Sequence, residues 1–417
     1  MDIILLTIGY PYPNKDVFIA NELSILSKKF NKVWIIPVFE GTLFPKKKYY
    51  GEIQNLPNNV YVQKIKYNIS NIFDFNKCKL KLLVRELSFS LKNNIKLLRW
   101  VFHANIIYHN IYHLIKTQNI VPEDTIVYSF WFHFNALAMS YLNNNIALKV
   151  SRAHGYDLYN EITVQPFKNY ILENIDAVFA CSKMGKDYLI KRYNCKKCYV
   201  SYLGTINNNV QINKFSQGND FIIISCARVE RIKRIHRIVD ALSLIEKYPV
   251  VWIHIGDGSL LNEIKEYAAL KLKGKANIKY KFMGALSNNE VLEYYRNNRI
   301  NLFINVSSSE GLPVSIMEAT SFGIPIIATD VGGVNEIVED NVNGFLLEKD
   351  YKDSQLAELI NKFISMPHVE YERFCRASLE KWMNNFNAVK NYESFFNTLI
   401  RMATEKGENN KHVESNC

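Results

Sequence analysis

The amino-acid sequence predicts an α/β protein built from two doubly wound domains. Its 417 residues exceed one ordinary domain and suit two domains of about 200 residues each. Short runs rich in Val, Ile and Phe recur between polar segments of helical length. Such near-continuous apolar runs are typical of parallel strands that helices cover on both faces. Apolar residues at 48% and charged residues at 22% exclude a disordered chain.

The apolar runs give the expected strands in chain order. In the first half, strands are expected over residues 2–8, 32–38, 125–131, 147–153 and 176–182. The pattern restarts in the second half, with strands expected over residues 220–227, 248–256, 301–307 and 325–330. Polar segments between the runs, such as residues 234–248, are expected to form the covering helices.

Residues 201–220 separate the two sets of strands, because Gly, Asn, Ser and Gln displace the apolar pattern there. We therefore expect one domain over residues 1–204 and a second over residues 205–385. A terminal helix over residues 386–404 is expected to return to the first domain. The polar residues 405–417 are expected to be disordered.

Basic charge is concentrated in the first half of the chain. Residues 1–205 hold 26 Lys and Arg against 14 Asp and Glu, whereas residues 206–417 hold 25 against 26. This asymmetry indicates an anionic partner, either nucleic acid or an anionic membrane surface. No pattern of a nucleic-acid-binding module accompanies the charge, so nucleic acid is not expected. Residues 77–102 resemble a basic amphipathic helix that lies on a bilayer; the alternative is helices that cover an α/β domain.

The remaining composition bears on localisation. The sequence has no run of eighteen apolar residues, so no transmembrane helix is expected. The N-terminus lacks a basic segment and a cleavage site, and we interpret it as the first strand rather than a signal peptide. The seven cysteines lack the spacing of a disulfide scaffold. These features predict a cytoplasmic protein.

A basic corner follows the strand expected over residues 220–227. Arg228 and Lys233 lie there, where a helix is expected to begin at residues 233–235. Cations beside the free N–H groups of a helix N-terminus suit a diphosphate. The alternative is ordinary solvated charge on a loop.

An acidic corner follows the strand expected over residues 301–307. Glu310 precedes a helix whose first residue is expected to be Pro313, and Glu318 falls in the second turn. Carboxylates accept hydrogen bonds from hydroxyl groups, so two acids near a diphosphate site indicate a sugar nucleotide. The alternative for Glu310 is stabilisation of the helix dipole.

One histidine also follows a predicted strand. His154 comes directly after residues 147–153, with Gly155 allowing a tight turn and Asp157 nearby. This arrangement indicates a functional histidine; the alternative is a loop histidine whose hydrogen bonds are satisfied locally.

Together these motifs resemble one family. Residues 307–319, SSSEGLPVSIMEA, match the E-x7-E motif of retaining GT-B glycosyltransferases of family 4, the glycosyltransferase group 1 family. Arg228 and Lys233 resemble its R-x4-K pair, and residues 255–260 resemble its I-G-x-G loop. Residues 154–157 resemble the H-G-x-D segment of members that build bacterial surface polysaccharides. The resemblance covers nearly the whole chain.

The resemblance implies two Rossmann-like domains that face one another across a cleft, the GT-B architecture. It implies that Arg228 and Lys233 hold the donor diphosphate and stabilise the leaving nucleotide. Glu318 would bind the nucleotide ribose, and Glu310 would contact the donor sugar. His154 would reach the donor sugar from the first domain.

Further positions follow from the same resemblance. Gly256 is implied in donor binding, as are Gly311 and Leu312 through their main-chain N–H groups. Asp157 joins His154 on the acceptor side. Catalytic roles are implied for His154, Glu310, Arg228 and Lys233.

The implied reaction moves a hexose or N-acetylhexosamine from a UDP- or GDP-sugar to a lipid-linked oligosaccharide on a polyprenyl diphosphate, with retention of configuration. Neither a metal nor another cofactor is expected, because Arg228 and Lys233 supply the positive charge. The Asn-, Lys- and Ile-rich composition suggests an AT-rich bacterial genome, and the resemblance then implies capsule, exopolysaccharide or O-antigen synthesis. The basic, aromatic-rich helices of the first domain are expected to hold the protein at the inner face of the plasma membrane. Two alternatives are a nucleotide-sugar epimerase of the same fold and a non-catalytic GT-B scaffold of a polysaccharide-assembly complex.

The sequence departs from the family pattern in the loop over residues 9–16. The adjacent glycines that many members use near the donor diphosphate are absent there. Lys15 or the exposed N–H groups of this loop are the candidates to serve instead.

Overall fold

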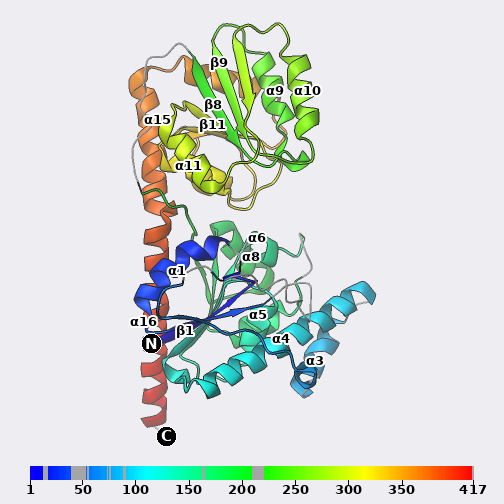
Figure 1. Ribbon diagram of the computed structural model, residues 1–417, viewed down its shortest axis with the longest axis vertical. Helices are drawn as coiled ribbons and strands as arrows, with labels where there is room; N and C mark the ends of the chain where they lie inside the picture. The colour runs from blue at the N-terminus through cyan, green and yellow to red at the C-terminus, as the bar shows by residue number, and fades with distance from the viewer. Residues whose placement is uncertain are drawn as a thin grey trace. The chain divides into compact units, whose positions relative to one another are not determined.

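The computed structural model describes residues 1–12, 17–38, 53, 56–72, 74, 77–87, 91–161, 165–208 and 220–415. The chain forms two compact units (Figure 1). Unit 1 comprises residues 1–202 and 388–417, and unit 2 comprises residues 203–387. Lys15, which the sequence analysis names as a candidate for the donor site, lies outside the described residues.

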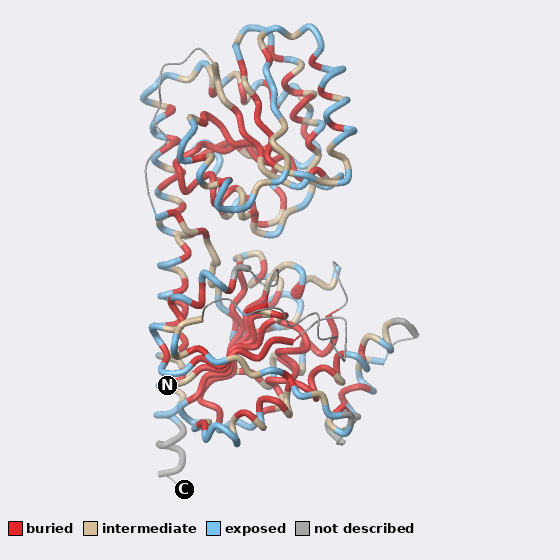
Figure 2. Tube along the Cα trace, in the orientation of Figure 1, coloured by how far each residue is buried: buried red, intermediate tan, exposed pale blue. Residues whose placement is uncertain are grey.

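Within the described residues, unit 1 contains a seven-stranded parallel sheet with the order β3-β2-β1-β4-β5-β6-β7. Its strands are β1 (Asp2–Thr7), β2 (Val33–Pro37), β3 (Val60–Val62), β4 (Thr125–Ser129), β5 (Leu148–Ala153), β6 (Ala177–Ala180) and β7 (Cys198–Val200). Every residue of β2, β4 and β5 is buried, as the near-continuous apolar runs predict (Figure 2). The strand order reverses between the neighbours β1 and β4.

Unit 1 also contains helices, several of which pack against this sheet. The helices are α1 (Val17–Lys29), α2 (Ile69–Ile72), α3 (Lys77–Glu86), α4 (Leu91–Thr117), α5 (Phe134–Ser140), α6 (Gly155–Leu158), α7 (Lys168–Asn174), α8 (Lys183–Tyr193) and α16 (Ala388–Ser415), with a 3₁₀ turn η2 (Pro122–Asp124). Both α5 and α16 contact β5. In the described part of the chain, no helix combines the length and the apolar character needed to cross a bilayer.

Unit 2 contains, among its described residues, a six-stranded parallel sheet with the order β10-β9-β8-β11-β12-β13. Its strands are β8 (Phe221–Cys226), β9 (Val250–Ile255), β10 (Ile278–Phe282), β11 (Leu302–Asn305), β12 (Ile326–Thr329) and β13 (Gly344–Leu347). Its helical elements are η3 (Arg231–Lys233), α9 (His236–Ser243), α10 (Leu261–Lys271), α11 (Asn288–Asn297), α12 (Val314–Ser321), α13 (Val334–Ile337), α14 (Asp353–Ile364), α15 (His368–Lys381) and the π-helical turn η4 (Trp382–Phe386). The two doubly wound sheets confirm the predicted fold class.

All nine strands that the apolar runs predict are present, each inside its predicted range. The apolar runs do not predict β3, β7, β10 and β13. These four strands are the edges of the two sheets. An edge strand has one neighbour and is often short or partly polar, so its sequence signal is weak.

The prediction of a disordered tail over residues 405–417 does not hold for residues 405–415, because α16 continues to Ser415. Residues 416–417 lie outside the described residues. The earlier part of α16 is docked on unit 1, where Phe396 packs edge-on against Phe30 of α1. Further along, Lys406 Nζ donates to Asp176 Oδ2 at 3.0 Å and to the main-chain oxygen of Ile146 at 3.1 Å. A helix that tertiary contacts have already nucleated adds one hydrogen bond for each further residue, so a polar composition does not stop it.

A buried ion pair ties α1 to β5 in unit 1. Arg152 Nη1 lies 3.4 Å from Glu22 Oε2, and neither side chain is more than 1% exposed. The Tyr128 hydroxyl donates to the other carboxylate oxygen at 3.1 Å. The Arg152 guanidinium also lies 4.2 Å from the ring centre of Phe395 on α16. Because buried charges lose their hydration, each partner of this pair depends on the other.

Glu22→Ala is expected to destabilise unit 1 by about 3–5 kcal/mol, because it leaves the Arg152 charge buried without its partner. The double variant Glu22→Leu with Arg152→Met removes both charges and is expected to lose much less stability. Hydrogen exchange of the β4 and β5 amides measures the effect in unit 1. Equal losses in the single and double variants would show that pairing of the charges is not what matters.

Candidate functional site

The candidate site of unit 2 lies at the carboxyl edge of its sheet. The strand order reverses between β8 and β11, which pair in parallel. Loops diverge at such a point, and open α/β sheets bind ligands in the crevice between them. The basic corner follows β8 and the acidic corner follows β11, so the two predicted corners are neighbours in space.

The two corners meet in a direct ion pair. Lys233 Nζ lies 2.6 Å from Glu310 Oε1, with the lysine side chain 25% exposed and the glutamate side chain 9% exposed. The same carboxylate oxygen accepts hydrogen bonds from Ser307 Oγ at 2.6 Å and from Asn305 Nδ2 at 3.2 Å. A cation and an acid from separate motifs therefore stand side by side, where one ligand can contact both.

Two glycines after β12 let that segment pack tightly against the loop that carries Glu310. Gly332 has a positive φ of 60°, and a Cβ atom there would lie 1.8 Å from the main-chain oxygen of Glu310. The Gly333 N–H donates to the Gly311 oxygen at 2.7 Å. Within the described residues, the N–H groups of Gly311 and Leu312 make no hydrogen bond, so they are available to a ligand.

Arg228, in the segment after β8, lines a pocket of about 600 Å³. The pocket is lined by Cys226, Ala227, Arg228, Ile255, Gly256, Asp257, Gly258, Ala285, Leu286 and Val291. The Arg228 side chain is 80% exposed, and its Nη2 donates to Glu230 Oε1 at 3.3 Å. Since this contact is exposed, it holds the guanidinium weakly, and Arg228 can turn toward a ligand in the pocket.

Gly256 shapes the wall of the same pocket. Its φ is +145°, and a Cβ atom there would lie 1.9 Å from the Ala227 oxygen. Its N–H donates to the Gly284 oxygen at 2.8 Å. The loops after β8 and β9 can approach this closely only with glycine at position 256.

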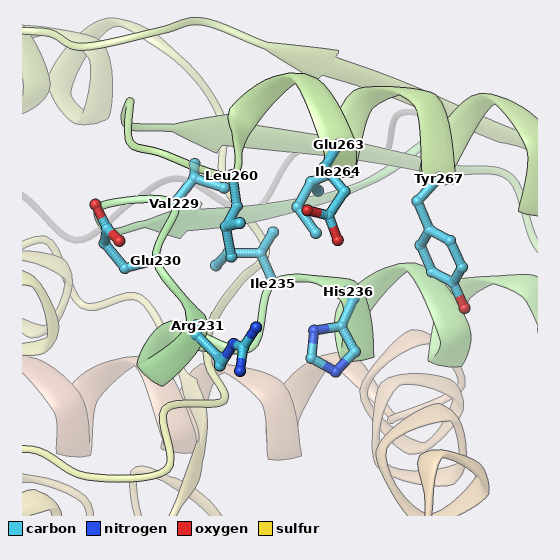
Figure 3. Close-up of a pocket in the computed structure, with 9 residues that line it drawn as sticks. All are labelled: Val229, Glu230, Arg231, Ile235, His236, Leu260, Glu263, Ile264 and Tyr267. Carbon is cyan, nitrogen blue, oxygen red and sulfur yellow. The ribbon is translucent and has the colours of Figure 1, made fainter.

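A second pocket, of about 390 Å³, lies between the η3–α9 segment and α10 (Figure 3). Arg231 and His236 line one wall, and Glu263 and Tyr267 line the other. The remaining lining residues are Val229, Glu230, Ile235, Leu260 and Ile264. None of the site residues that the sequence predicts lines this pocket. Arg228 and Gly256 line the larger one, so we place the candidate site there.

Glu318 lies on α12 and is only 6% exposed. Burial raises the pKa of Glu318 to about 7, and the hydrogen bond from the Asn288 side-chain amide limits the rise. The Asn288 Nδ2 donor contacts Glu318 Oε1 directly. The sequence analysis does not predict Asn288. The feature that could have indicated it is its position directly after Ser287, which caps α11 in a capping box with Glu290.

Two local predictions at these corners are wrong in detail. Residues 231–233 form a 3₁₀ turn, and α9 begins only at His236, because Arg234 adopts a left-handed conformation that ends the turn. Pro313 has extended backbone and is the N-cap of α12 rather than its first helical residue. Lys233 therefore belongs to the turn before α9, not to the helix.

In unit 1, His154 and Asp157 form the corner after β5. The Asp157 carboxylate accepts the His154 N–H on Oδ1 and the Phe132 N–H on Oδ2, both at 2.6 Å. The His154 ring lies 4.5 Å from the ring centre of Trp131. Burial alone would lower the pKa of His154, but Cys181 and Asp157 outweigh burial and raise it to about 10. Asp157 is fully buried, so it holds this corner together rather than facing solvent.

Lys168 of α7 completes the same corner, and the sequence analysis does not predict it. Its Nζ donates to the main-chain oxygens of Phe132 and Asp157. Burial lowers the pKa of Lys168 to about 7, against the raising effect of Asp157. A lysine within an ordinary helical pattern carries no sequence signal for such a contact, since its partners are main-chain atoms.

Glu318→Gln is expected to stabilise the protein progressively as the pH rises from about 4.5 to 7. The folded-state pKa of Glu318 lies above its ordinary value, so the native carboxyl group keeps a proton that the unfolded chain loses. The stability of the wild type therefore falls through this pH window, by about 3 kcal/mol at most, while glutamine does not titrate.

Urea unfolding of both proteins at pH 5, 6, 7 and 8 measures this difference. Glu293→Gln, at an exposed position of α11, controls for the removal of a charge. A stability difference that stays constant with pH would contradict the assignment.

Residues 208–381 match the model of the glycosyl transferases group 1 family. This range contains Arg228, Lys233, Glu310 and Glu318. Among relatives, the uncharacterized glycosyltransferase MJ1178 of Methanocaldococcus jannaschii is 28% identical over 283 residues, which are 62% of this chain and 76% of that protein.

Two further relatives have more specific names. The capsular polysaccharide biosynthesis glycosyltransferase CapM of Staphylococcus aureus is 25% identical over 272 residues, 58% of this chain and 69% of that protein. The UDP-Gal:alpha-D-GlcNAc-diphosphoundecaprenol alpha-1,3-galactosyltransferase of Escherichia coli is 28% identical over 156 residues. The latter match spans 37% of this chain and 38% of that protein.

Solved structures match over almost the full chain. The glycosyltransferase of Rickettsia africae has a TM-score of 0.65 and 18% identity, covering 96% of this chain and 98% of that one. Anabaena Alr3699/HepE, solved in complex with UDP and glucose, has a TM-score of 0.59 and 16% identity, covering 96% and 100%. At these identities the matches show the fold. The chain thus has the fold of the GT-B glycosyltransferases, and its residues 208–381 form a glycosyl transferases group 1 domain.

Proposed function

We propose that the protein is a retaining, metal-independent glycosyltransferase of family 4 that uses a UDP- or GDP-sugar to extend a lipid-linked oligosaccharide. The observation that carries the proposal is the contact of Lys233 with Glu310. Lys233 follows β8 in the same segment as Arg228, which lines the pocket of about 600 Å³. The contact of Lys233 with Glu310 sets a cation suited to a diphosphate next to an acid suited to sugar hydroxyls. Two similar proteins support a UDP-sugar: HepE was solved with UDP and glucose, and the Escherichia coli relative is named for UDP-Gal.

In this proposal, different residues of the donor site bind different parts of the nucleotide-sugar. Arg228 and Lys233 take the diphosphate, and the N–H groups of Gly311 and Leu312 add uncharged donors. Glu310 binds hydroxyls of the sugar that is transferred, and Glu318 binds the ribose.

Retention follows from attack on the face that the leaving group occupies. The bond between the anomeric carbon and the diphosphate oxygen breaks while the acceptor oxygen bonds to that carbon. The acceptor proton passes to the departing phosphate oxygen. Negative charge develops on the diphosphate, where Arg228 and Lys233 stabilise it in place of a metal ion. His154 and Asp157 of unit 1 are the proposed acceptor-side residues.

The acceptor proposal rests on the names of relatives. The Escherichia coli relative acts on a diphosphoundecaprenol-linked sugar, and the Staphylococcus aureus relative belongs to capsule synthesis. We propose a sugar chain on a polyprenyl diphosphate, in capsule, exopolysaccharide or O-antigen synthesis. Transfer would take place at the inner face of the plasma membrane.

Helices α3 and α4 of unit 1 supply a surface for that membrane. Val84 of α3 is 62% exposed, Leu87 directly after α3 is 57% exposed, and Ile95 of α4 is 51% exposed. Lys81 and Arg85 are exposed on α3 as well. Apolar side chains interleaved with basic ones suit the surface of an anionic bilayer.

The donor proposal predicts that one nucleotide among UDP, GDP, ADP and CDP raises the melting temperature. At a hundred times its Kd a ligand adds about 2.7 kcal/mol, which shifts melting by a few degrees. Lys233→Ala should abolish the shift, because it removes the cation that meets the diphosphate. Lys265→Ala, at an exposed position of α10, is the control that should keep it.

A turnover assay with the matching nucleotide-sugar separates the alternatives. Release of the nucleoside diphosphate together with a glycosylated lipid supports the transferase. Conversion of the sugar without transfer would identify an epimerase, and absence of any stabilising nucleotide would favour the non-catalytic scaffold.

Membrane association predicts flotation of the protein with phosphatidylglycerol-containing vesicles at low salt and loss of flotation at high salt. Val84→Glu with Ile95→Glu should weaken it by removing exposed apolar surface. Val369→Glu, on α15 of unit 2, replaces a valine that is 76% exposed and should have no effect. Flotation that is insensitive to both salt and the α3–α4 variant would count against this surface.

A further inference from the structure

Arg234, the residue after Lys233, has an unusual backbone conformation. Its φ and ψ are 48° and 39°, the left-handed region that favours glycine. It ends the 3₁₀ turn of η3, and its N–H donates to the Arg231 oxygen at 3.3 Å. The backbone of an arginine in this conformation is strained, so other contacts of the residue have to offset the cost.

The Arg234 guanidinium makes three such contacts, all to main-chain oxygens. Its Nε donates to Val306 at 2.7 Å and its Nη2 to Ser307 at 3.1 Å. Its Nη1 donates to Lys349 at 2.7 Å. The planar fork of the guanidinium thus joins the loop after β8 to the loop after β11 and to the segment after β13.

The contacts of Arg234 lead directly to the Lys233–Glu310 pair. Ser307, whose oxygen Arg234 holds, donates through Oγ to Glu310 Oε1. On the other side, the main-chain N–H of Ser308 donates to the Ile232 oxygen at 2.8 Å. The turn that carries Lys233 and the loop that carries Glu310 are therefore fastened together on both sides of the ion pair.

We propose that Arg234 is a positioning residue for the donor site. It fixes the distance between Lys233 Nζ and Glu310 Oε1, so that a diphosphate and the sugar attached to it meet their cation and their acid together. The side chain of Arg234 donates its hydrogen bonds to main-chain oxygens. In this proposal it acts on the donor indirectly, by holding Lys233 and Glu310 in place. The inference rests on the proposed donor site and names the residue that holds its geometry.

Arg237 provides a matched control. It is also an arginine at the start of α9, and its Nη2 donates to the Tyr351 oxygen at 2.5 Å. Its Nε pairs with Asp353 Oδ1 at 2.7 Å. These contacts fasten α9 to the segment after β13 but do not reach the loop that carries Glu310.

The test compares Arg234→Gly, Arg234→Lys and Arg237→Gln. Glycine suits the left-handed backbone and removes the guanidinium, while a lysine ammonium cannot bridge three oxygens in a plane. We expect both Arg234 variants to bind UDP or GDP, whichever stabilises the wild type, about tenfold more weakly or worse, as for loss of one charge-assisted hydrogen bond. Affinity for the uncharged nucleoside should not change, and Arg237→Gln should bind the diphosphate normally.

Hydrogen exchange over residues 306–312 gives a readout that needs no ligand. We expect faster exchange there in the Arg234 variants and not in Arg237→Gln. Unchanged exchange, or diphosphate affinity equal to the wild type in Arg234→Gly, would overturn the positioning role. Equal weakening in Arg237→Gln would also overturn it, because the effect would then be general destabilisation. If the wild type binds neither UDP nor GDP, the proposed function fails as well, and that outcome is distinct from the others.

Discussion

Parallel strand pairing determines where functional side chains can come together in this protein. All the strand pairs described in units 1 and 2 are parallel, so within each sheet the strands end along one edge. At the point where the order reverses in unit 2, this brings Lys233 and Glu310 into contact across 77 residues of sequence. The same constraint in unit 1 brings the Phe132 N–H to the Asp157 carboxylate across 25 residues. The residues of each corner need no motif in common, because the sheet supplies their proximity.

The charges of Lys233, Arg228 and Glu310 also favour one orientation of the proposed donor. A diphosphate placed beside Glu310 would meet like charge, and at short range this repulsion is large in a partly buried site. Placed on the side of Lys233 and Arg228, the same diphosphate meets cations. Glu310 is then left for the hydroxyl groups of an uncharged sugar, which donate hydrogen bonds to it. In the proposed function, the polarity of the ion pair would therefore also orient the donor along the edge of the sheet.

Much of the fold could be predicted from the sequence because buried central strands carry a strong signal. The nine predicted strands are the central ones, and the four missed strands are the edges. The edge strand β10, with the sequence IKYKF, shows why: its three middle residues are exposed, and two are lysines. The composition of a strand with so few buried positions does not distinguish it from a loop.

The site could be predicted only in part, for a related reason. Lys233, Glu310 and Glu318 stand in motifs whose spacing can be read along the chain. Arg234 and Lys168 act on main-chain oxygens of distant loops. Any residue supplies a main-chain oxygen, so no partner residue type marks these contacts in the sequence. Side chains that hold a site in place are therefore harder to predict than those that meet the ligand.

In the proposed function, Glu318 would serve the donor site at the expense of stability. A carboxyl group on a buried face of α12 is unfavourable when ionised, and this burial raises the pKa of Glu318 to about 7. An apolar residue at this position would pack without this cost. The carboxylate becomes favourable once ribose hydroxyls donate to it, so in the proposed function nucleotide binding and ionisation of Glu318 support each other. Binding of the nucleotide would then lower the pKa of Glu318, and part of the binding free energy would go into charging a group that the free protein keeps largely protonated below neutral pH.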